Sequence, residues 1–156
     1  MPGLLRPATV DDACSIFTWR NDSWLVGLSS GRHAVTWEEH ADWFRRALAD
    51  PRYLLLIIEN EGGVGAGTVR LEQVDEERAI VTIYLLREFT GRGLGVQALS
   101  EACARGFARW PVCAIHAYIR ADNRPSRSAF AKAGFTDADP GRDCPPDHCE
   151  MILRRS

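Results

Sequence analysis

The chain has 156 residues, a length at which one domain with a single hydrophobic core is expected. Apolar residues make up 46% and charged residues 26%, which is typical of a globular protein rather than a disordered one. The formal charge of −2 argues against a general nucleic-acid-binding protein, because that class carries a basic excess. Eighteen of the nineteen basic residues are arginine, which fits either a genomic bias or the use of arginine for phosphate recognition.

The sequence contains no apolar run that approaches the length needed to span a bilayer. The longest apolar stretch, residues 54–58, has the length of a strand, and the first residues lack the pattern of a signal peptide. The five cysteines are scattered, and three lie in apolar helical or strand patterns, where buried free cysteine is expected. We therefore expect a reduced, cytoplasmic protein without a membrane segment.

Two helices are predicted in the first third of the chain. The first begins at residues 10–13, where two aspartates suit the positive end of the helix dipole, and ends near Asn21. Residues 23–35 are expected to form a loop or a short helix. The second helix begins at a capping box, Thr36-x-x-Glu39, and its apolar residues recur at helical spacing until Pro51 ends it.

An antiparallel meander is predicted next, with strands over residues 53–58, 65–71 and 79–86. The third strand is apolar on both faces, so we expect it to be central. A glycine-rich loop then leads into a helix, followed by a strand over residues 112–119. A short helix capped by Asn123 and a last strand over residues 151–153 complete the chain. The sequence therefore predicts an α/β (α+β) fold with a mixed, mostly antiparallel central sheet flanked by helices.

The loop Thr90-Gly91-Arg92-Gly93-Leu94-Gly95 joins the predicted central strand to a helix. A glycine-rich turn at this position aims backbone N–H groups and the helix dipole at one point, which suits a phosphate. Taken alone, the spacing is equally compatible with a tight loop that binds nothing. A nucleoside-triphosphate loop would require Gly-Lys-Ser/Thr, and a dinucleotide loop would follow the first strand of a parallel sheet. Neither pattern is present.

A second pair of motifs follows in order, Asn123-Arg124-Pro125-Ser126 and Ala131-Lys132-Ala133-Gly134-Phe135. Together with the glycine loop they make residues 4–135 resemble the GNAT superfamily of acyl-CoA-dependent N-acetyltransferases. The sequence departs from the family at Thr90, where Gln or Arg is usual. The resemblance implies a single GNAT acetyltransferase domain over residues 1–156, with acetyl-CoA as cosubstrate and no metal. It also implies direct attack of a primary amine on the thioester in a ternary complex.

The resemblance further implies how acetyl-CoA is held. Backbone N–H groups of residues 92–96 bind the pyrophosphate, and Asn123 orients the pantetheine or the leaving sulfur. A bulged central strand around Leu85 and Leu86 offers its edge to the pantetheine and an N–H to the oxyanion. The residues predicted to bind acetyl-CoA are Leu85, Leu86, Thr90, Gly91, Arg92, Gly93, Leu94, Gly95, Val96, Asn123, Ser126, Arg127 and Lys132.

The catalytic residues implied by the resemblance are Glu72, Asn123 and Ser126. Glu72 is the preferred general base, although a solvated carboxylate at a hairpin end is an equal alternative, and Ile80 occupies a place where relatives carry an acid. Phe130 replaces the tyrosine that commonly serves as general acid. Proton donation from Ser126, Tyr118 or water, unassisted departure of the thiolate, and loss of activity all stay open.

The acceptor is indicated by Trp19-Arg20-Asn21-Asp22, Ser29 or Ser30, and His40-x-x-Trp43. These residues resemble a subgroup that acetylates 4-amino sugars on nucleotide carriers, such as the acetyltransferase of the pseudaminic-acid pathway, and partly the ribosomal-protein N-terminal acetyltransferases. We therefore expect an amino-sugar nucleotide acceptor, bound by Arg20, Asn21, His40 and Trp43. A protein N-terminus or a small polyamine is the alternative, as is a non-catalytic acyl-CoA-binding module. A homodimer is compatible with each.

Core packing competes with acceptor binding for some of these side chains. For His40 it is favoured over contact with the sugar nucleotide, and for Trp37, Trp43 and Phe44 it is favoured over stacking on a base. His116 is expected to be a partly buried structural residue. Residues 143–149 contain two cysteines and a histidine, too few for a closed zinc site, and we predict a proline-rich loop there.

Overall fold

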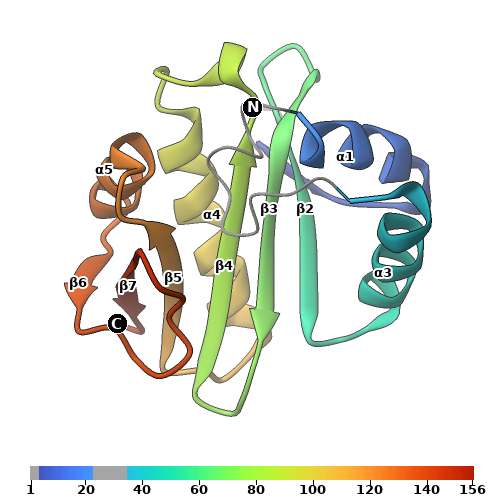
Figure 1. The fold of residues 1–156 in the computed structure, drawn as a ribbon. Coiled ribbons are helices and arrows are strands. Elements are labelled where there is room, and N and C mark those ends of the chain that lie inside the picture. The colour runs from blue at the N-terminus through green and yellow to red at the C-terminus, as the bar shows by residue number, and fades with distance from the viewer. Residues whose placement is uncertain (1–3, 23–34) are drawn as a thin grey trace.

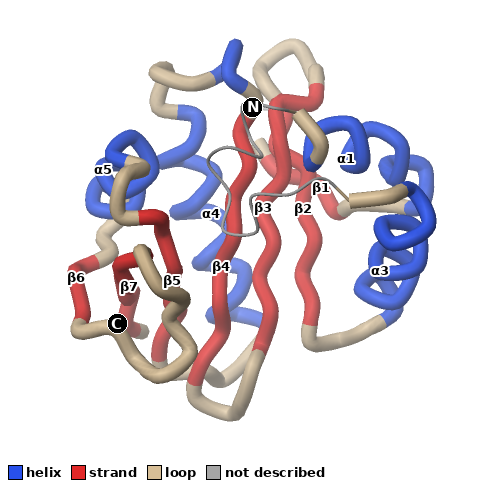
Figure 2. The backbone as a smooth tube through the Cα atoms, in the orientation of Figure 1, coloured by secondary structure: helices blue, strands red, loops and turns tan. Residues whose placement is uncertain are grey.

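The computed structural model describes residues 4–22 and 35–156. These residues form a seven-stranded sheet flanked by helices (Figures 1 and 2). The strands are β1 (Leu5–Pro7), β2 (Tyr53–Glu59), β3 (Gly65–Gln73), β4 (Arg78–Leu85), β5 (Ala114–Arg120), β6 (Thr136–Ala138) and β7 (His148–Arg154). The helices are α1 (Ala13–Arg20), α3 (Trp37–Ala49), α4 (Leu94–Arg109) and α5 (Arg124–Lys132), with short 3₁₀ turns η1 (Val10–Asp12) and η2 (Arg87–Phe89).

The sheet order is β1-β2-β3-β4-β5-β7-β6, and β4 and β5 form the one parallel pair among the described strands. The predicted fold class, the meander of β2, β3 and β4, and the central place of β4 are therefore confirmed. Two strands were not predicted. β1 and β6 have three residues each, so neither carries enough alternation to be recognised from sequence.

The two faces of the sheet carry separate cores, because successive side chains of a strand point to opposite faces. On one face, buried residues of the central strands, such as Val69 and Leu71 of β3, pack against buried residues of α4 and α5, such as Leu99 of α4. On the other face, Ile57 packs against Ile16 of α1 and Phe44 of α3. Figure 1 shows α4 behind the sheet, and α1 with α3 beside β2. Helices α1 and α3 thus cover the β2 end of that second face.

The predicted helix boundaries are confirmed by their caps. The Thr36 hydroxyl accepts the Glu39 N–H at 3.2 Å, and the Glu39 carboxylate accepts the Thr36 N–H at 3.1 Å. The Asn123 side chain accepts the Ser126 N–H at the start of α5. Gly134 follows α5 with φ +101°, a conformation that favours glycine. The predicted loop or short helix over residues 23–35 lies, apart from Val35, outside the described residues.

Some expected positions are wrong. Trp37 was predicted in the core, but it is 42% exposed, because α3 starts at the surface. Of the five free cysteines, only Cys103 is buried, whereas Cys14 and Cys113 are exposed on the outer sides of their segments. The proline-rich loop ends at residue 147, since β7 begins at His148.

None of the described helices is long and apolar enough to cross a membrane. Within the same residues no group of three or more His, Cys, Asp or Glu side chains is placed to hold a metal ion.

Candidate active site

The central feature of the site is a fork between the two parallel strands. β4 and β5 pair only from Arg78 with Ala114 to Ile80 with His116. Beyond these residues β4 continues to Leu85 and β5 to Arg120 without pairing to one another, and Figure 1 shows them diverging in front of α4. The fork therefore leaves two strand edges unpaired in the middle of the sheet, where an extended ligand can add its own hydrogen bonds.

The backbone of β4 determines which groups face the fork. The Leu86 N–H donates to the Ala66 carbonyl at 2.8 Å, so the backbone of Leu86 is turned to β3. Because neighbouring residues of a strand direct their backbone groups to opposite edges, Leu85 and Ile83 face β5. The β3–β4 register also runs from Gln73 to Gly67 without a shift, so the predicted bulge is wrong. The opening comes from divergence of β5, and the N–H that faces it belongs to Leu85 rather than Leu86.

Gly67 allows β3 to lie close to the end of β4. A Cβ atom at this position would lie 2.0 Å from the backbone oxygen of Tyr84. Only glycine therefore permits this approach, and it fixes Tyr84 and Leu85 against β3 at the mouth of the fork.

The glycine loop lies at the end of β4, directly before α4. Gly91 and Gly93 have φ of +78° and +77°, and a Cβ atom at either would meet nothing within 4 Å. These glycines are thus required for backbone conformation rather than for lack of space. Gly93 is the N-cap of α4 and offers no side chain to the helix N-terminus, so the N–H groups of the first turn, from Leu94 to Val96, are directed at the mouth of the fork.

The remaining loop residues have more limited roles. The Thr90 hydroxyl donates to the Arg87 carbonyl at 2.7 Å, which closes the turn before the glycines. Arg92 is exposed, so its guanidinium can reach a bound phosphate from outside. The helix that follows is confirmed, with Leu99 and Cys103 buried against the sheet.

Helix α5 begins on the other side of the fork, directly after β5. Asn123 and Ser126 are half-buried at its first turn, where the Asn123 Oδ1 accepts the Ser126 N–H at 3.2 Å. The exposed Arg127 donates to the Ala121 carbonyl at 3.2 Å. Lys132 is the last residue of the helix, roughly 12 Å along the axis from the first turn. The structure thus brings Asn123 and Ser126 to the end of β5 that borders the fork. Arg127 instead lines a hollow with Asp137 of β6 and Met151 of β7, and Lys132 lies at the far end of α5.

Phe130 is buried in the core and contacts Phe135 edge to face, with ring centroids 5.0 Å apart. The position that usually carries the tyrosine acid therefore holds no proton donor. Tyr118 is half-buried on β5, two residues past the point where the fork opens. Burial raises the pKa of the Tyr118 hydroxyl, so it stays protonated at neutral pH.

Glu72 lies on the same sheet face as Tyr84 but further from the loop. It pairs with Ile80, whereas Tyr84 pairs with Thr68, so the two lie four residues apart along the ladder, roughly 13 Å. Glu72 lies opposite Tyr53 in the β2–β3 ladder, and burial and this carboxylate raise the pKa of the Tyr53 hydroxyl. A proton from an amine near Leu85 would reach Glu72 only through intervening groups or water.

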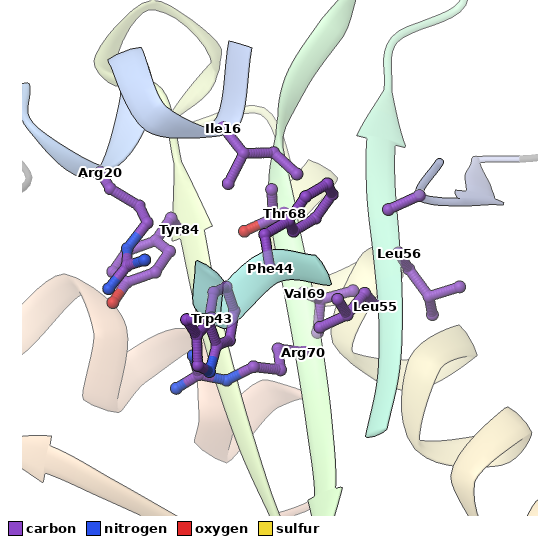
Figure 3. Close-up of a pocket in the computed structure, with 11 residues that line it drawn as sticks. Ile16, Arg20, Trp43, Phe44, Leu55, Leu56, Thr68, Val69, Arg70 and Tyr84 are labelled. Carbon is purple, nitrogen blue, oxygen red and sulfur yellow. The ribbon is translucent and has the colours of Figure 1, made fainter. Parts of the chain in front are cut away.

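A small, mostly apolar hollow lies between the sheet and helices α1 and α3 (Figure 3). It is lined by apolar side chains such as Ile16, Phe44 and Leu55, and by Arg20, Trp43, Thr68, Arg70 and Tyr84. Two guanidinium groups lie against the Trp43 ring, with Cζ of Arg20 at 4.9 Å and Cζ of Arg70 at 5.2 Å from its centroid. Arg20 and Trp43 are thus together, as predicted for an acceptor site. Arg70 and Tyr84 were not singled out from the sequence, and only strand pairing brings them here.

His40 is a core residue rather than a substrate contact. It is fully buried, its Nε2 lies 2.9 Å from the Ala13 carbonyl, and its Nδ1 lies 3.1 Å from a nitrogen of Arg20. Burial lowers the pKa of His40, so the ring is neutral and accepts from Arg20. Its role is to position that guanidinium.

The Asn21 side chain is hydrogen-bonded to the backbone of Val35. It donates to the Val35 carbonyl at 2.9 Å and accepts the Val35 N–H at 2.8 Å. Both polar atoms are therefore engaged, and Asn21 fixes Val35 beside the end of α1.

His116 has the structural role that was expected. Its Nδ1 lies 2.6 Å from a carboxylate oxygen of Glu150, and both side chains are largely buried. The other oxygen of Glu150 accepts the Gly141 N–H at 2.8 Å, so this group ties β5, β7 and the loop before β7 together.

Comparisons with known proteins agree with this geometry. Residues 4–136 match the profile of a family described as acetyltransferase (GNAT) domain. A search of curated protein sequences gave no significant match.

Solved structures share the fold across nearly the whole chain. A domain from Methanocaldococcus jannaschii has a TM-score of 0.81 at 19% identity, covering 97% of each chain. Spermidine N-acetyltransferase from Vibrio cholerae, in complex with CoA and spermine, has a TM-score of 0.81 at 16% identity, covering 96% of this chain and 94% of that one. Aminoglycoside acetyltransferase AAC(6')-Ib, in complex with coenzyme A, has a TM-score of 0.82 at 20% identity, covering 97% and 94%.

Proposed function

Because the chain belongs to the acetyltransferase (GNAT) domain family, we propose that it transfers an acetyl group from acetyl-CoA to a primary amine. The observation that carries the proposal is the fork between β4 and β5, which opens at the glycine-capped N-terminus of α4. An anion site and an unpaired strand edge in this arrangement suit the two polar parts of coenzyme A, its pyrophosphate and its pantetheine amides.

In this proposal the N–H groups from Gly93 to Val96 hold the pyrophosphate, and Arg92 adds positive charge. The pantetheine lies in the fork, with its amides bonded to the β4 edge. The Leu85 N–H then donates to the thioester oxygen and stabilises the oxyanion, without reorganisation because Gly67 fixes this part of β4. The Asn123 amide can donate to the pantetheine, since its oxygen is already engaged by the Ser126 N–H.

The transfer proceeds by direct attack. The neutral amine forms a bond to the thioester carbon, the carbonyl electrons move to oxygen, and the tetrahedral intermediate collapses with cleavage of the C–S bond. The amine loses a proton, for which Glu72 is the proposed base acting through bound water, because of its distance from Leu85. The thiolate receives a proton from Ser126, Tyr118 or solvent. With a thiol pKa of about 8.5 it is also a tolerable leaving group without help.

For the acceptor we propose an amino-sugar nucleotide. This is supported by Arg20 and Trp43, which lie together beside Tyr84, the residue before Leu85. Guanidinium groups suit the carrier phosphates, and the Trp43 ring suits stacking or hydrophobic contact. His40 and Asn21 support this site indirectly, by holding Arg20 and Val35.

The test is an acceptor panel with acetyl-CoA, read by release of free thiol and by the mass of the acetylated product. The panel contains a 4-amino-sugar nucleotide, a peptide with a free N-terminus, and spermidine. Turnover of the amino-sugar nucleotide is expected, whereas turnover of the peptide or spermidine alone would overturn the acceptor assignment. Absence of turnover with retained acetyl-CoA binding would favour a binding module.

The base is tested in the same assay. Glu72→Gln should lower turnover without weakening acetyl-CoA binding, since the residue lies away from the glycine loop. Glu76→Gln, in the exposed turn between β3 and β4, is the matched control. Equal rates for Glu72→Gln and the control would remove Glu72 as the base.

A further inference from the structure

The hollow beside the fork contains two arginines from distant parts of the chain. Arg20 ends α1 and Arg70 lies in the middle of β3, yet both guanidinium groups contact the ring of Trp43 on α3 (Figure 3). Arg20 also contacts His40 at 3.1 Å, and Arg70 donates to the Thr82 hydroxyl at 3.4 Å. Both partners are neutral: Thr82 is a hydroxyl, and burial lowers the pKa of His40.

Arg20 and Arg70 differ from the other buried or half-buried arginines because neither forms an ion pair with a carboxylate. Six arginines of the described residues are buried or half-buried, and four of them form ion pairs with Asp or Glu. Arg20 and Arg70 have no carboxylate oxygen within 4 Å among the described residues, and residues 1–3 and 23–34 contain neither Asp nor Glu. The four paired arginines are Arg6, Arg78, Arg105 and Arg120.

No neighbouring acid forms an ion pair with either arginine among the described residues. Glu72 lies two residues beyond Arg70 on the same strand face, but its carboxylate oxygens are not within 4 Å of the Arg70 guanidinium. Burial lowers the pKa of the Arg20 guanidinium and the positive charge of Arg70 lowers it further, while Tyr84 and Glu39 act in the opposite direction. Two cations held this close to each other without an acid between them attract an anion.

The position of the pair relates it to the reaction. Tyr84 lines the same hollow as both arginines and directly precedes Leu85, whose backbone faces the fork. The hollow is thus separated by one residue of β4 from the backbone N–H proposed to bind the thioester oxygen.

We propose that Arg20 and Arg70 form an anion subsite for the acceptor, so that the enzyme selects amines whose molecules also carry a phosphate or carboxylate group. This inference rests on the proposed acetyltransferase function. Planar guanidinium groups bind both kinds of anion through paired hydrogen bonds, and Trp43 holds the two groups in place. A polycation such as spermine, whose amines are protonated at neutral pH, is repelled by the same pair. The proposed preference for anionic acceptors is thus opposite in charge to the polyamine that is bound in the spermidine N-acetyltransferase of the same fold.

The subsite is tested first by binding, independently of turnover. The protein is saturated with coenzyme A to occupy the glycine loop, and its melting temperature is then measured against inorganic pyrophosphate and against UDP. Saturable stabilisation is expected for the wild type, and it should be lost in Arg20→Gln and Arg70→Gln. Arg45→Gln, on the exposed side of α3, is the charge-matched control and should retain it. Absence of stabilisation in the wild type, or equal loss in the control, would overturn the subsite.

Paired acceptors then identify the anion. Glucosamine is compared with glucosamine 6-phosphate, butylamine with 4-aminobutyrate, and spermidine is added as the polycation. The anionic member of at least one pair should have a kcat/KM about ten-fold or more above its neutral partner. Arg70→Gln should remove this advantage, whereas the control Arg45→Gln should keep it. A preference in the phosphate pair or in the carboxylate pair names the source of the anion. Preference for spermidine would overturn the inference but leave the acetyltransferase function intact, whereas failure to bind coenzyme A would overturn both.

Discussion

The conformation of Gly93 gives a sharp prediction for the phosphate loop. Gly93 has φ +77°, and a Cβ atom there would meet no atom within 4 Å, so Gly93→Ala introduces conformational strain without a clash. The left-handed conformation costs an L-residue about 1–2 kcal/mol. For a chain of this size that corresponds to a fall in melting temperature of about 2–8 °C.

Binding should fall more steeply than stability. Relief of the strain rotates the N–H groups of the first turn of α4 away from the pyrophosphate, and each hydrogen bond to a charged group contributes about 1.5–3 kcal/mol. The affinity for acetyl-CoA should therefore fall about ten- to hundred-fold. Isothermal titration of acetyl-CoA into the wild type and the variant measures this change directly.

Gly95→Ala is the matched control two residues further on. Gly95 does not have positive φ, and a Cβ atom there would lie 3.6 Å from the Leu85 side chain, an ordinary contact. Alanine is also the better helix former, so stability should be equal or higher, with affinity within about three-fold of wild type. Wild-type affinity in Gly93→Ala, or an equal loss in both variants, would refute the assignment of the pyrophosphate to these N–H groups.

Three further outcomes are expected. Asn123→Asp keeps the cap of α5 and hence the melting temperature, but it removes the amide donor and should lower the affinity for acetyl-CoA. Asn123→Ala, which loses a cap worth about 1 kcal/mol, provides the comparison. Unchanged affinity in both variants would exclude Asn123 from the cofactor site. Burial lowers the pKa of His40 from 6.5, so the unfolded chain binds a proton at this residue more readily than the folded chain, and stability falls as pH decreases below 6.5. Melting curves of His40→Phe across this range should lack the loss of stability that is due to His40. A pH profile parallel to that of the wild type would contradict this expectation. Burial raises the pKa of Cys103 to about 12, so alkylation of the folded protein should modify the exposed Cys14 and spare Cys103, as peptide mass mapping will test; equal labelling would be inconsistent with the core.

The features that sequence predicted well are those fixed by neighbouring residues. The capping box at Thr36, the Asn123 cap and the left-handed Gly134 each depend on a few adjacent positions, so their spacing alone indicates the local structure. The glycine loop was placed correctly for the same reason, because strand, loop and helix follow one another in the chain.

The features that sequence did not predict depend on contacts between distant segments. Arg70 shares one face of β3 with Thr68 and Glu72, and nothing in the neighbouring sequence distinguishes it from a solvated arginine. Only the register of β3 with β4, and the packing of α1 and α3 on the sheet, bring Arg70 to Arg20. The prediction of a bulge in β4 was wrong for the same reason. The opening lies where β5 stops pairing with β4, and neither strand's own sequence determines that point.

A crystal structure of the complex with acetyl-CoA tests the central claim most directly. We expect the pyrophosphate within about 2.7–3.2 Å of the N–H groups from Gly93 to Val96, and the pantetheine between β4 and β5 with the thioester oxygen at the Leu85 N–H. Acetyl-CoA bound elsewhere on the chain, or a fork closed by pairing of β4 with β5, would contradict it.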